Sequence, residues 1–302
     1  MSISSSNWIT EFIPREGKGG CGMNSALPVS GSALSGHLHL DCDVRADGLS
    51  YIAHQDFRAP IHIGKGHVDR GQLVLNIANP TAGFFDGDRV ETSVTVKPGA
   101  SLVLSTPAAS RVYQTRSGKP AANHQQFRVG ENAALEWIPE PFIPHAGASY
   151  IQTTSIDLHA SSSLLFFEWL APGRVAKGEC FAYQNLRWEL DLSVNSRLIA
   201  RERYNLRPDN HSLEALRARF PAAHYLSVYA AGNMTLDWPA VELDALTNED
   251  ISLGHGPLQH DVHVIRALCR DSLHTSRLMD HLRRLLYAHA GKEPPNLGRI
   301  FS

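Results

Sequence analysis

The segment Val96–Leu102, VKPGASL, decides the fold because its layout of strand, turn and strand returns along the chain. Val129–Leu135 (VGENAAL) and Leu158–Leu164 (LHASSSL) have the same layout, with apolar residues six positions apart. A fourth unit keeps this spacing when it is counted from Leu192 to Leu198. The four starting residues are 33, 29 and 34 positions apart. A period of about 30 residues in a strand-rich chain is typical of stacked coils.

The strands around these turns follow the period of two that places alternate side chains on opposite faces. Val90–Val96 alternates in this way, and so does His37–Leu40. We therefore predict a mainly β fold of stacked, helically coiled β-strand hairpins, layered like a sandwich, with a small C-terminal α/β portion of about two helices. Any antiparallel protein also alternates apolar strands with Gly and Ser turns, so an ordinary antiparallel arrangement remains an alternative to the repeat.

The pattern changes after Leu206, where Pro, Asp and Asn interrupt the alternation. A helix is predicted over 211–220 and a strand over 262–268. A longer helix is predicted over 272–289, with one apolar stripe and Asp271 as its N-cap. These elements form the predicted C-terminal α/β portion.

The predicted domain organisation follows from changes in composition and apolar pattern along the chain. A Gly- and Ser-rich beginning predicts a flexible N-terminal lead-in over residues 1–35. We expect a single domain over 36–302, divided into a β-coil core at 36–207 and a C-terminal α+β part at 208–302.

Composition excludes several classes of protein. The 28 Lys and Arg residues nearly balance the 30 Asp and Glu residues, which argues against a nucleic-acid binder and against attraction to anionic lipid. No apolar run is long enough to span a membrane, and no secretory signal pattern is present. The four cysteines are scattered without a CxxC pair, so a disulfide framework or zinc module is not expected. We expect a cytoplasmic protein.

Two carboxylates lie inside otherwise apolar strands. Leu164, Phe166 and Glu168 share one face by alternation, and Leu198, Ala200 and Glu202 share another. If the coils stack in register, Glu168 and Glu202 come close together on an inward-facing column. A buried carboxylate is normally paired, protonated or bound to a cation. Arg174, Arg201 and Arg203 are available as partners.

The sixteen histidines carry no metal-binding spacing of high specificity. His37 and His39 share a strand face, but solvent-exposed or core-satisfied histidines are the favoured interpretation of this pattern. HExxH, the P-loop and the GxSxG elbow are absent from the sequence. The chain offers no convincing pair of nucleophile and base.

Four segments, taken in order, resemble the urease accessory protein UreD (UreH) family. They are Thr81–Arg89 (TAGFFDGDR), Ser105–Tyr113 (STPAASRVY), Leu135–Pro144 (LEWIPEPFIP), and Glu168 followed by Gly173-Arg174 and Gly178-Glu179. The resemblance spans about 57–206 and returns in the final helix and in Gly298–Phe301. Where the family usually has Gly-Gly-Asp, this chain has Asp86-Gly87-Asp88, which adds a carboxylate.

The resemblance implies a non-enzymatic, mostly β protein that takes part in urease maturation. Its expected partners are the urease apoprotein, a UreF-type accessory protein and, through it, a UreG-type GTPase; neither nucleic acid nor a membrane is expected. No tightly bound cofactor is implied. Transient Ni²⁺ would instead be guided through an internal passage, and carboxylate, imidazole and water are ligands that Ni²⁺ accepts.

Carried over by motif, the candidate residues for that nickel passage are Asp88, Glu140, Glu168 and Glu202. Ser105 and Thr106 are expected to line the passage, and His145 and Asp86 are candidate extra ligands. Arg174 and Glu179 are expected to be structural.

A second hypothesis of another class is a β-rich carbohydrate-active enzyme that uses paired carboxylates such as Glu140 and Glu168. It predicts an open groove lined by aromatic side chains, for which Trp137, Trp169 and Trp188 are the candidates. These tryptophans serve a hydrophobic core equally well. A third hypothesis is a scaffold of the UreD type that serves a client other than urease.

Overall fold

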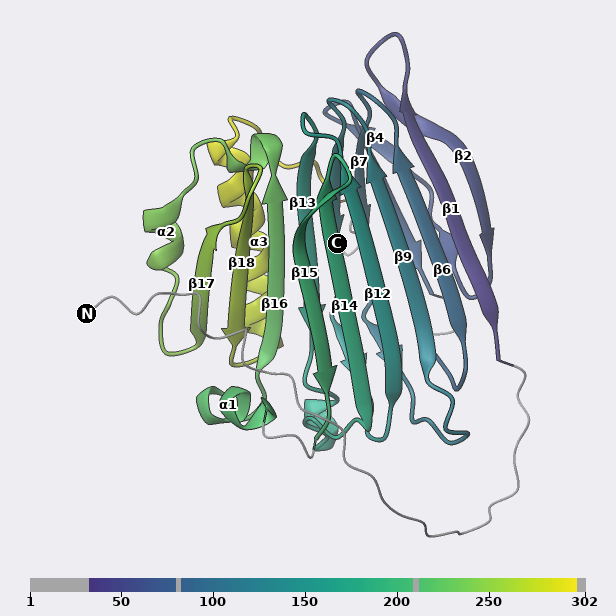
Figure 1. Ribbon diagram of the computed structural model, residues 1–302, viewed down its shortest axis with the longest axis vertical. Helices are drawn as coiled ribbons and strands as arrows, with labels where there is room; N and C mark the ends of the chain where they lie inside the picture. Colours follow the sequence, from purple (N-terminus) through teal and green to yellow (C-terminus); the bar gives the residue numbers. More distant parts are fainter. Residues whose placement is uncertain (1–32, 80–82, 209–211, 298–302) are drawn as a thin grey trace.

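A computed structural model describes residues 33–79, 83–208 and 212–297 (Figure 1). Within these ranges the chain forms two β-sheets packed face to face, with helices at the C-terminal side. Most of the predicted lead-in, residues 1–32, lies outside the described residues. The mainly β fold with a small helical C-terminal portion is confirmed.

The first sheet has seven strands in the spatial order β15, β14, β12, β9, β6, β1, β2. Their bounds are β1 (Ser35–Val44), β2 (Ser50–Arg58), β6 (Arg89–Val96), β9 (Ala121–Val129), β12 (Ser149–Leu158), β14 (Asn185–Val194) and β15 (Arg197–Leu206). The five inner strands run parallel to one another, whereas the edge strands β2 and β15 are antiparallel to their neighbours.

The second sheet has eleven strands, and its main path is β17, β18, β16, β13, β10, β7, β5, β3. Their bounds are β3 (His62–Ile63), β5 (Gln72–Ala78), β7 (Ser101–Ser105), β10 (Ala134–Ile138), β13 (Ser163–Leu170), β16 (His224–Ala231), β17 (Ile251–Pro257) and β18 (Val262–Cys269). The short strands β4 (His67–Asp69), β8 (Ser110–Val112) and β11 (Phe142–Pro144) join beside this path.

The repeat has a clear structural meaning for its first three units. In each one the chain leaves a strand of the seven-stranded sheet, turns, and enters a strand of the other sheet: β6 to β7, β9 to β10, β12 to β13. Hydrogen bonds then join equivalent strands of successive units in parallel. The units are therefore crossovers between sheets rather than hairpins, and Gly99 at φ 74° serves the first of these turns.

The fourth unit differs from the prediction. Strands β14 and β15 form an antiparallel hairpin within one sheet, because Asn195 and Ser196 both have left-handed φ values, 47° and 63°, as a tight two-residue hairpin turn requires. A bulge follows, so Leu198 is 42% exposed while Ala200 is buried. Leu198 therefore does not share the buried face with Ala200 and Glu202.

Helix α3 (Ser272–His289) covers the outer face of the second sheet, so the molecule has three layers there. Its N-terminus is the predicted one, since the Asp271 side chain accepts a hydrogen bond from the His274 N–H at 3.0 Å. The predicted stripe of Leu278, Leu282 and Leu286 is buried against the sheet. Figure 1 shows α3 behind β16 and β18.

The C-terminal part extends the second sheet. Strands β16, β18 and β17 continue it in antiparallel fashion beyond β13, and sequence alternation had indicated only β18. Helices α1 (Ser212–Arg219) and α2 (Ala240–Asp244) flank these strands. The proposed boundary near residue 207 stays a prediction.

Candidate functional site

The segments that carry the family resemblance meet at one end of the sandwich, although they are distant in sequence. Tyr113 N–H donates to the Phe84 carbonyl at 3.0 Å, and Ser110 N–H donates to the Pro141 carbonyl at 3.0 Å. Ala171 N–H donates to Phe142 at 2.9 Å, which brings in the last segment. We call this region the motif end; it comprises the segments 83–88, 106–120, 139–148 and 171–184, which include the short strands β8 and β11.

A polar cluster lies between the two sheets beside the motif end. Glu168 of β13 is 7% exposed, and its Oε1 accepts a hydrogen bond from the Trp188 indole N–H of β14 at 2.8 Å. Glu202 of β15 forms an ion pair with Arg266 of β18 and accepts a hydrogen bond from the Tyr204 hydroxyl at 2.6 Å. The cluster therefore joins both sheets through their polar side chains.

Further hydroxyl groups complete this cluster. Arg266 also donates to Ser227 Oγ at 3.0 Å and to the Tyr229 hydroxyl at 3.1 Å. The Tyr204 and Tyr225 hydroxyls lie 3.0 Å apart. Because Tyr204 already donates its proton to Glu202, Tyr225 is the donor in that second bond. We call Glu168, Trp188, Glu202, Tyr204, Ser227, Tyr225, Tyr229 and Arg266 the acid cluster.

Electrostatics distinguish the two carboxylates of the acid cluster. Burial raises the pKa of Glu168 to about 7, the Trp188 hydrogen bond and Arg266 act in the opposite direction, and the neighbouring Glu202 raises it further. The pKa of Glu168 therefore lies well above that of an ordinary carboxyl. The two carboxylates influence each other across the sandwich, because β13 and β15 belong to different sheets. The prediction that Glu168 and Glu202 stack in one column of successive coils is therefore wrong, although the two residues are close together.

The arginine of the acid cluster was missed by sequence reasoning. Of the three arginines considered, Arg174 pairs with Glu179, and Arg201 and Arg203 both pair with Asp191 on the exposed side. Arg266 lies in the alternating strand β18, among residues that are otherwise mostly apolar. A cation in a strand of that kind is the one signal that could have identified it.

Two further candidate acids of the motif end, Asp88 and Asp86, contact backbone amides. Asp88 is buried, and its two oxygens accept N–H groups of Leu34 and Phe85, each at 2.8 Å. Asp86 Oδ2 accepts the N–H groups of Arg116 at 2.7 Å and Ser117 at 2.6 Å. Both carboxylates thus hold the loops in place, which is a structural role that the motif alone did not reveal.

The remaining candidates lie close to the same end. Thr106 Oγ1 accepts the Glu140 N–H at 2.8 Å, and Ser105 Oγ donates to Asn76 Oδ1 at 2.6 Å. His145 is buried, and its Nε2 has no hydrogen-bond partner in the part of the chain that the structure describes. Burial and the nearby Arg174 lower the pKa of His145, so the imidazole is neutral at pH 7.

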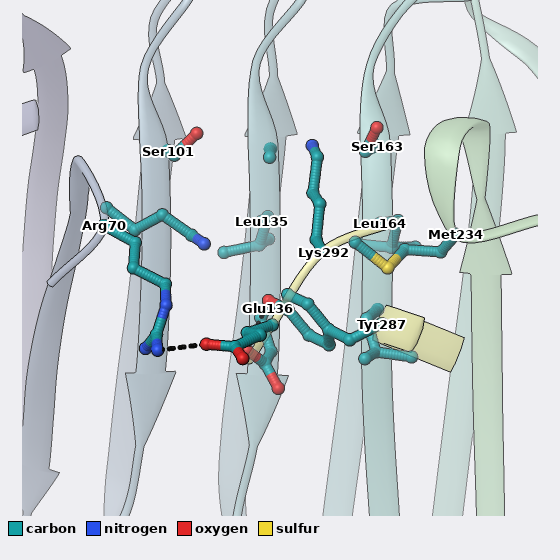
Figure 2. A pocket seen from close by; sticks show the side chains of 13 residues that line it. Arg70, Ser101, Leu135, Glu136, Ser163, Leu164, Met234, Tyr287 and Lys292 are labelled. Atoms are coloured by element: carbon teal, nitrogen blue, oxygen red, sulfur yellow. Dashed lines mark hydrogen bonds and ion pairs between the residues drawn. The ribbon is translucent and has the colours of Figure 1, made fainter. Parts of the chain in front are cut away.

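A pocket of about 330 Å³ lies elsewhere, between the outer face of the second sheet and the segment after α3 (Figure 2). Glu136, Tyr287 and Lys292 line it, and Arg70 reaches it from the turn before β5. None of the eight carried-over candidates lines this pocket or the shallower one at the opposite turns. Among the residues that the structure describes, no three His, Cys, Asp or Glu side chains are placed to hold a metal ion together.

The hypothesis of a carbohydrate-active enzyme predicted that three tryptophans line an open groove, and this prediction is wrong. Trp137, Trp169 and Trp188 are all buried in hydrophobic clusters, so they do not line an open groove. Glu168 is enclosed as well. That hypothesis has no further support from the described side chains.

Fold and site together define a β-sandwich scaffold built from parallel crossovers, with titratable groups enclosed between its sheets. The chain belongs to the UreD urease accessory protein family, whose family model matches residues 34–302. It is 34% identical over 263 residues to the urease accessory protein UreD of Opitutus terrae, covering 84% of this chain and 94% of that protein.

Two other relatives named urease accessory protein UreD have similar identity over shorter lengths. The protein of Kocuria rhizophila is 35% identical over 188 residues, covering 60% of this chain and 51% of that protein. The protein of Herpetosiphon aurantiacus is 30% identical over 218 residues, covering 72% and 74%. Family membership supports a role in urease maturation. No helix among the described residues is long and apolar enough to cross a bilayer.

Proposed function

We propose that this protein is a non-enzymatic cytoplasmic scaffold that guides Ni²⁺ toward the active site of the urease apoprotein. Its partners in this role are the apoprotein, a UreF-type accessory protein and, through that protein, a UreG-type GTPase. Nickel is cargo here and not a resident cofactor. Family membership supports the assembly, and the acid cluster supports the mechanism.

The observation that carries the mechanism is the enclosed carboxylate of Glu168. Among the described side chains, the neutral indole of Trp188 is the one that donates a hydrogen bond to it, and its pKa is raised to about 7. Such a group can release its proton and bind a cation near neutral pH. Replacing the proton by Ni²⁺ adds one net positive charge to the site. Carboxylate oxygens and water are ligands that Ni²⁺ accepts.

The partner carboxylate keeps the binding weak. Glu202 is neutralised by Arg266, so an arriving cation meets one free carboxylate and the positive charge of the guanidinium. Release is as necessary as entry for an ion that passes through a site. Asp88, Glu140, Ser105 and Thr106 lie in or beside the motif end, and with His145 and Asp86 they remain the proposed lining of the route.

The test is co-expression of the chain with the urease structural subunits and the other accessory proteins. We expect Glu168→Gln and Glu202→Gln to lower urease specific activity and urease nickel content severalfold. Glu131→Gln is the matched control, because Glu131 is exposed in a turn far from the acid cluster. Full nickel loading of urease by both cluster variants, with normal thermal melting, would end the passage mechanism.

A further inference from the structure

The motif end also presents an exposed surface that the acid cluster does not use. Phe85 is 48% exposed and Val175 is 45% exposed, which is unusual for large apolar side chains. Phe85 stacks on Tyr113, with ring centroids 4.6 Å apart and planes inclined by 16°. We call Phe85, Tyr113 and Val175, with the cations Arg111, Arg116, Lys119 and Arg174 around them, the aromatic–basic patch.

The patch is held in a fixed shape by hydrogen bonds between its loops. Tyr113 N–H donates to the Phe84 carbonyl beside Phe85, and Asp86 accepts two N–H groups from the loop that carries Arg116. Gly87 N–H donates to the Lys119 carbonyl at 3.1 Å. A surface that is already ordered loses little conformational entropy when a partner binds.

At the motif end, the positively charged side chains are more exposed to solvent than the negatively charged ones. The side chains of Arg111, Arg116 and Lys119 are exposed and take part in no ion pair within the described chain. The nearby carboxylates are less exposed and have other contacts: Asp86 and Asp88 accept backbone N–H groups, and Glu179 pairs with Arg174. The surface therefore presents cations to the solvent although the whole chain has a net charge of −2.

A buried imidazole gives an independent indication of a ligand. His145 is 7% exposed, lies edge-on to Tyr113 at 4.8 Å, and leaves Nε2 without a hydrogen-bond partner. Its electrostatic neighbours are Arg174, Glu179 and Arg111 of the same end. An unsatisfied buried polar atom costs about 1–3 kcal/mol, which a hydrogen-bond partner supplied from outside would recover.

We propose that the aromatic–basic patch is a docking surface for the acidic face of a folded partner protein in the urease maturation assembly. Tyr, Phe and Arg side chains in a fixed arrangement are typical of the energetic centre of protein interfaces. The exposed cations select a partner that presents carboxylates, and the apolar rings provide the desolvated contact. The proposal rests on the proposed function and adds the surface and the charge of the partner to it.

The experiment is a pull-down with the affinity-tagged full chain, co-expressed with the urease structural subunits and the other accessory proteins. We expect Phe85→Ser and Arg111→Glu each to reduce recovery of one partner at least tenfold. Val241→Ser and Arg128→Glu are matched controls, because both side chains are exposed outside the patch. Recovery by the wild type should fall as salt rises, and Arg111→Glu should lessen that dependence.

Three outcomes overturn the proposal. In the first, the patch variants retain every partner as well as the controls do. In the second, partners are lost only together with thermal stability. In the third, the patch binds vesicles rich in phosphatidylserine or duplex DNA while the binding of the partners is unaffected. If the variants assemble and activate urease normally, the docking surface is wrong and the proposed function stands. If the wild-type chain neither assembles with these proteins nor activates urease, the proposed function is wrong as well.

Discussion

Glu136 and Glu168 lie on neighbouring strands of the same sheet, β10 and β13, and point to opposite faces. Glu136 faces α3, where it pairs with Arg283 and accepts the Tyr287 hydroxyl at 2.9 Å. Glu168 faces the other sheet and accepts one hydrogen bond from a neutral indole. Both are buried carboxylates, yet within the described ranges only Glu136 forms an ion pair.

The difference separates a carboxylate that holds the fold from one that is available for chemistry. The Glu136 pair fastens α3 and the segment after it to the sheet, since Arg283 also donates to the Pro295 carbonyl at 2.9 Å. Glu168 retains the capacity to bind a proton near neutral pH, which the raised pKa expresses, and the proposed function uses the same carboxylate for a cation. Burial alone therefore says little about the role of a carboxylate, and the side chain that pairs with it decides that role.

The largest effect is expected from Glu136→Ala. It leaves the Arg283 guanidinium buried without a counter-charge, and breaking a buried ion pair costs about 3–5 kcal/mol. Urea unfolding should record this loss of stability. The double variant Glu136→Leu with Arg283→Met should recover most of it, and a loss below about 1 kcal/mol for Glu136→Ala would show that the pair does not hold α3.

A pH-dependent effect is expected at Glu168. Its pKa is about 7 in the folded chain and near 4.5 when unfolded, so the folded state binds the extra proton between these values. The resulting stabilisation is complete below pH 4.5 and is lost as pH rises through 7. Relative to Glu168→Gln, the wild type should lose at most about 3 kcal/mol of unfolding free energy from pH 5 to 8. Parallel stability curves for the two proteins would contradict the raised pKa.

Arg266→Met is expected to have a somewhat smaller effect than the Glu136 variant. It removes the ion pair with Glu202 and the bonds to two hydroxyl groups, and bonds to charged groups contribute about 1.5–3 kcal/mol. It should also raise the pKa of Glu168 further, because Arg266 is the cation that lowers it. Carbon-detected NMR titration of the Glu carboxyls measures this shift, and an unchanged Glu168 titration would exclude the coupling.

The smallest effect is expected at the exposed ion pair of Arg201 with Asp191. Arg201→Ala should leave the midpoint of urea unfolding almost unchanged, since exposed pairs are screened by solvent. It should leave nickel loading of urease unchanged. A loss of loading by this variant would show that the outer arginines of β15 contribute to the site after all.

The repeat and the helix cap show what could be predicted from local sequence. Turns with Pro and Gly between apolar strands are local features, and so is Asp271 before an apolar stripe of period 3.6. Strand β17 was missed because its residues are half-exposed and include two glycines, so its pattern is weak. The hairpin of β14 and β15 was missed because a two-residue turn of Asn195 and Ser196 resembles the longer crossover turns in composition.

The sequence by itself determined the family, the mainly β architecture, the crossover period and the enclosure of Glu168, because each depends on residue type and spacing along one segment. Only the tertiary structure decided that Glu202 pairs with Arg266, that Asp86 and Asp88 hold loops, and that aromatic rings and cations gather at the motif end. These facts depend on which segments meet in space. Sequence spacing is silent about such contacts, because they join residues as far apart in the chain as Asp86 and Arg116 or Glu202 and Arg266.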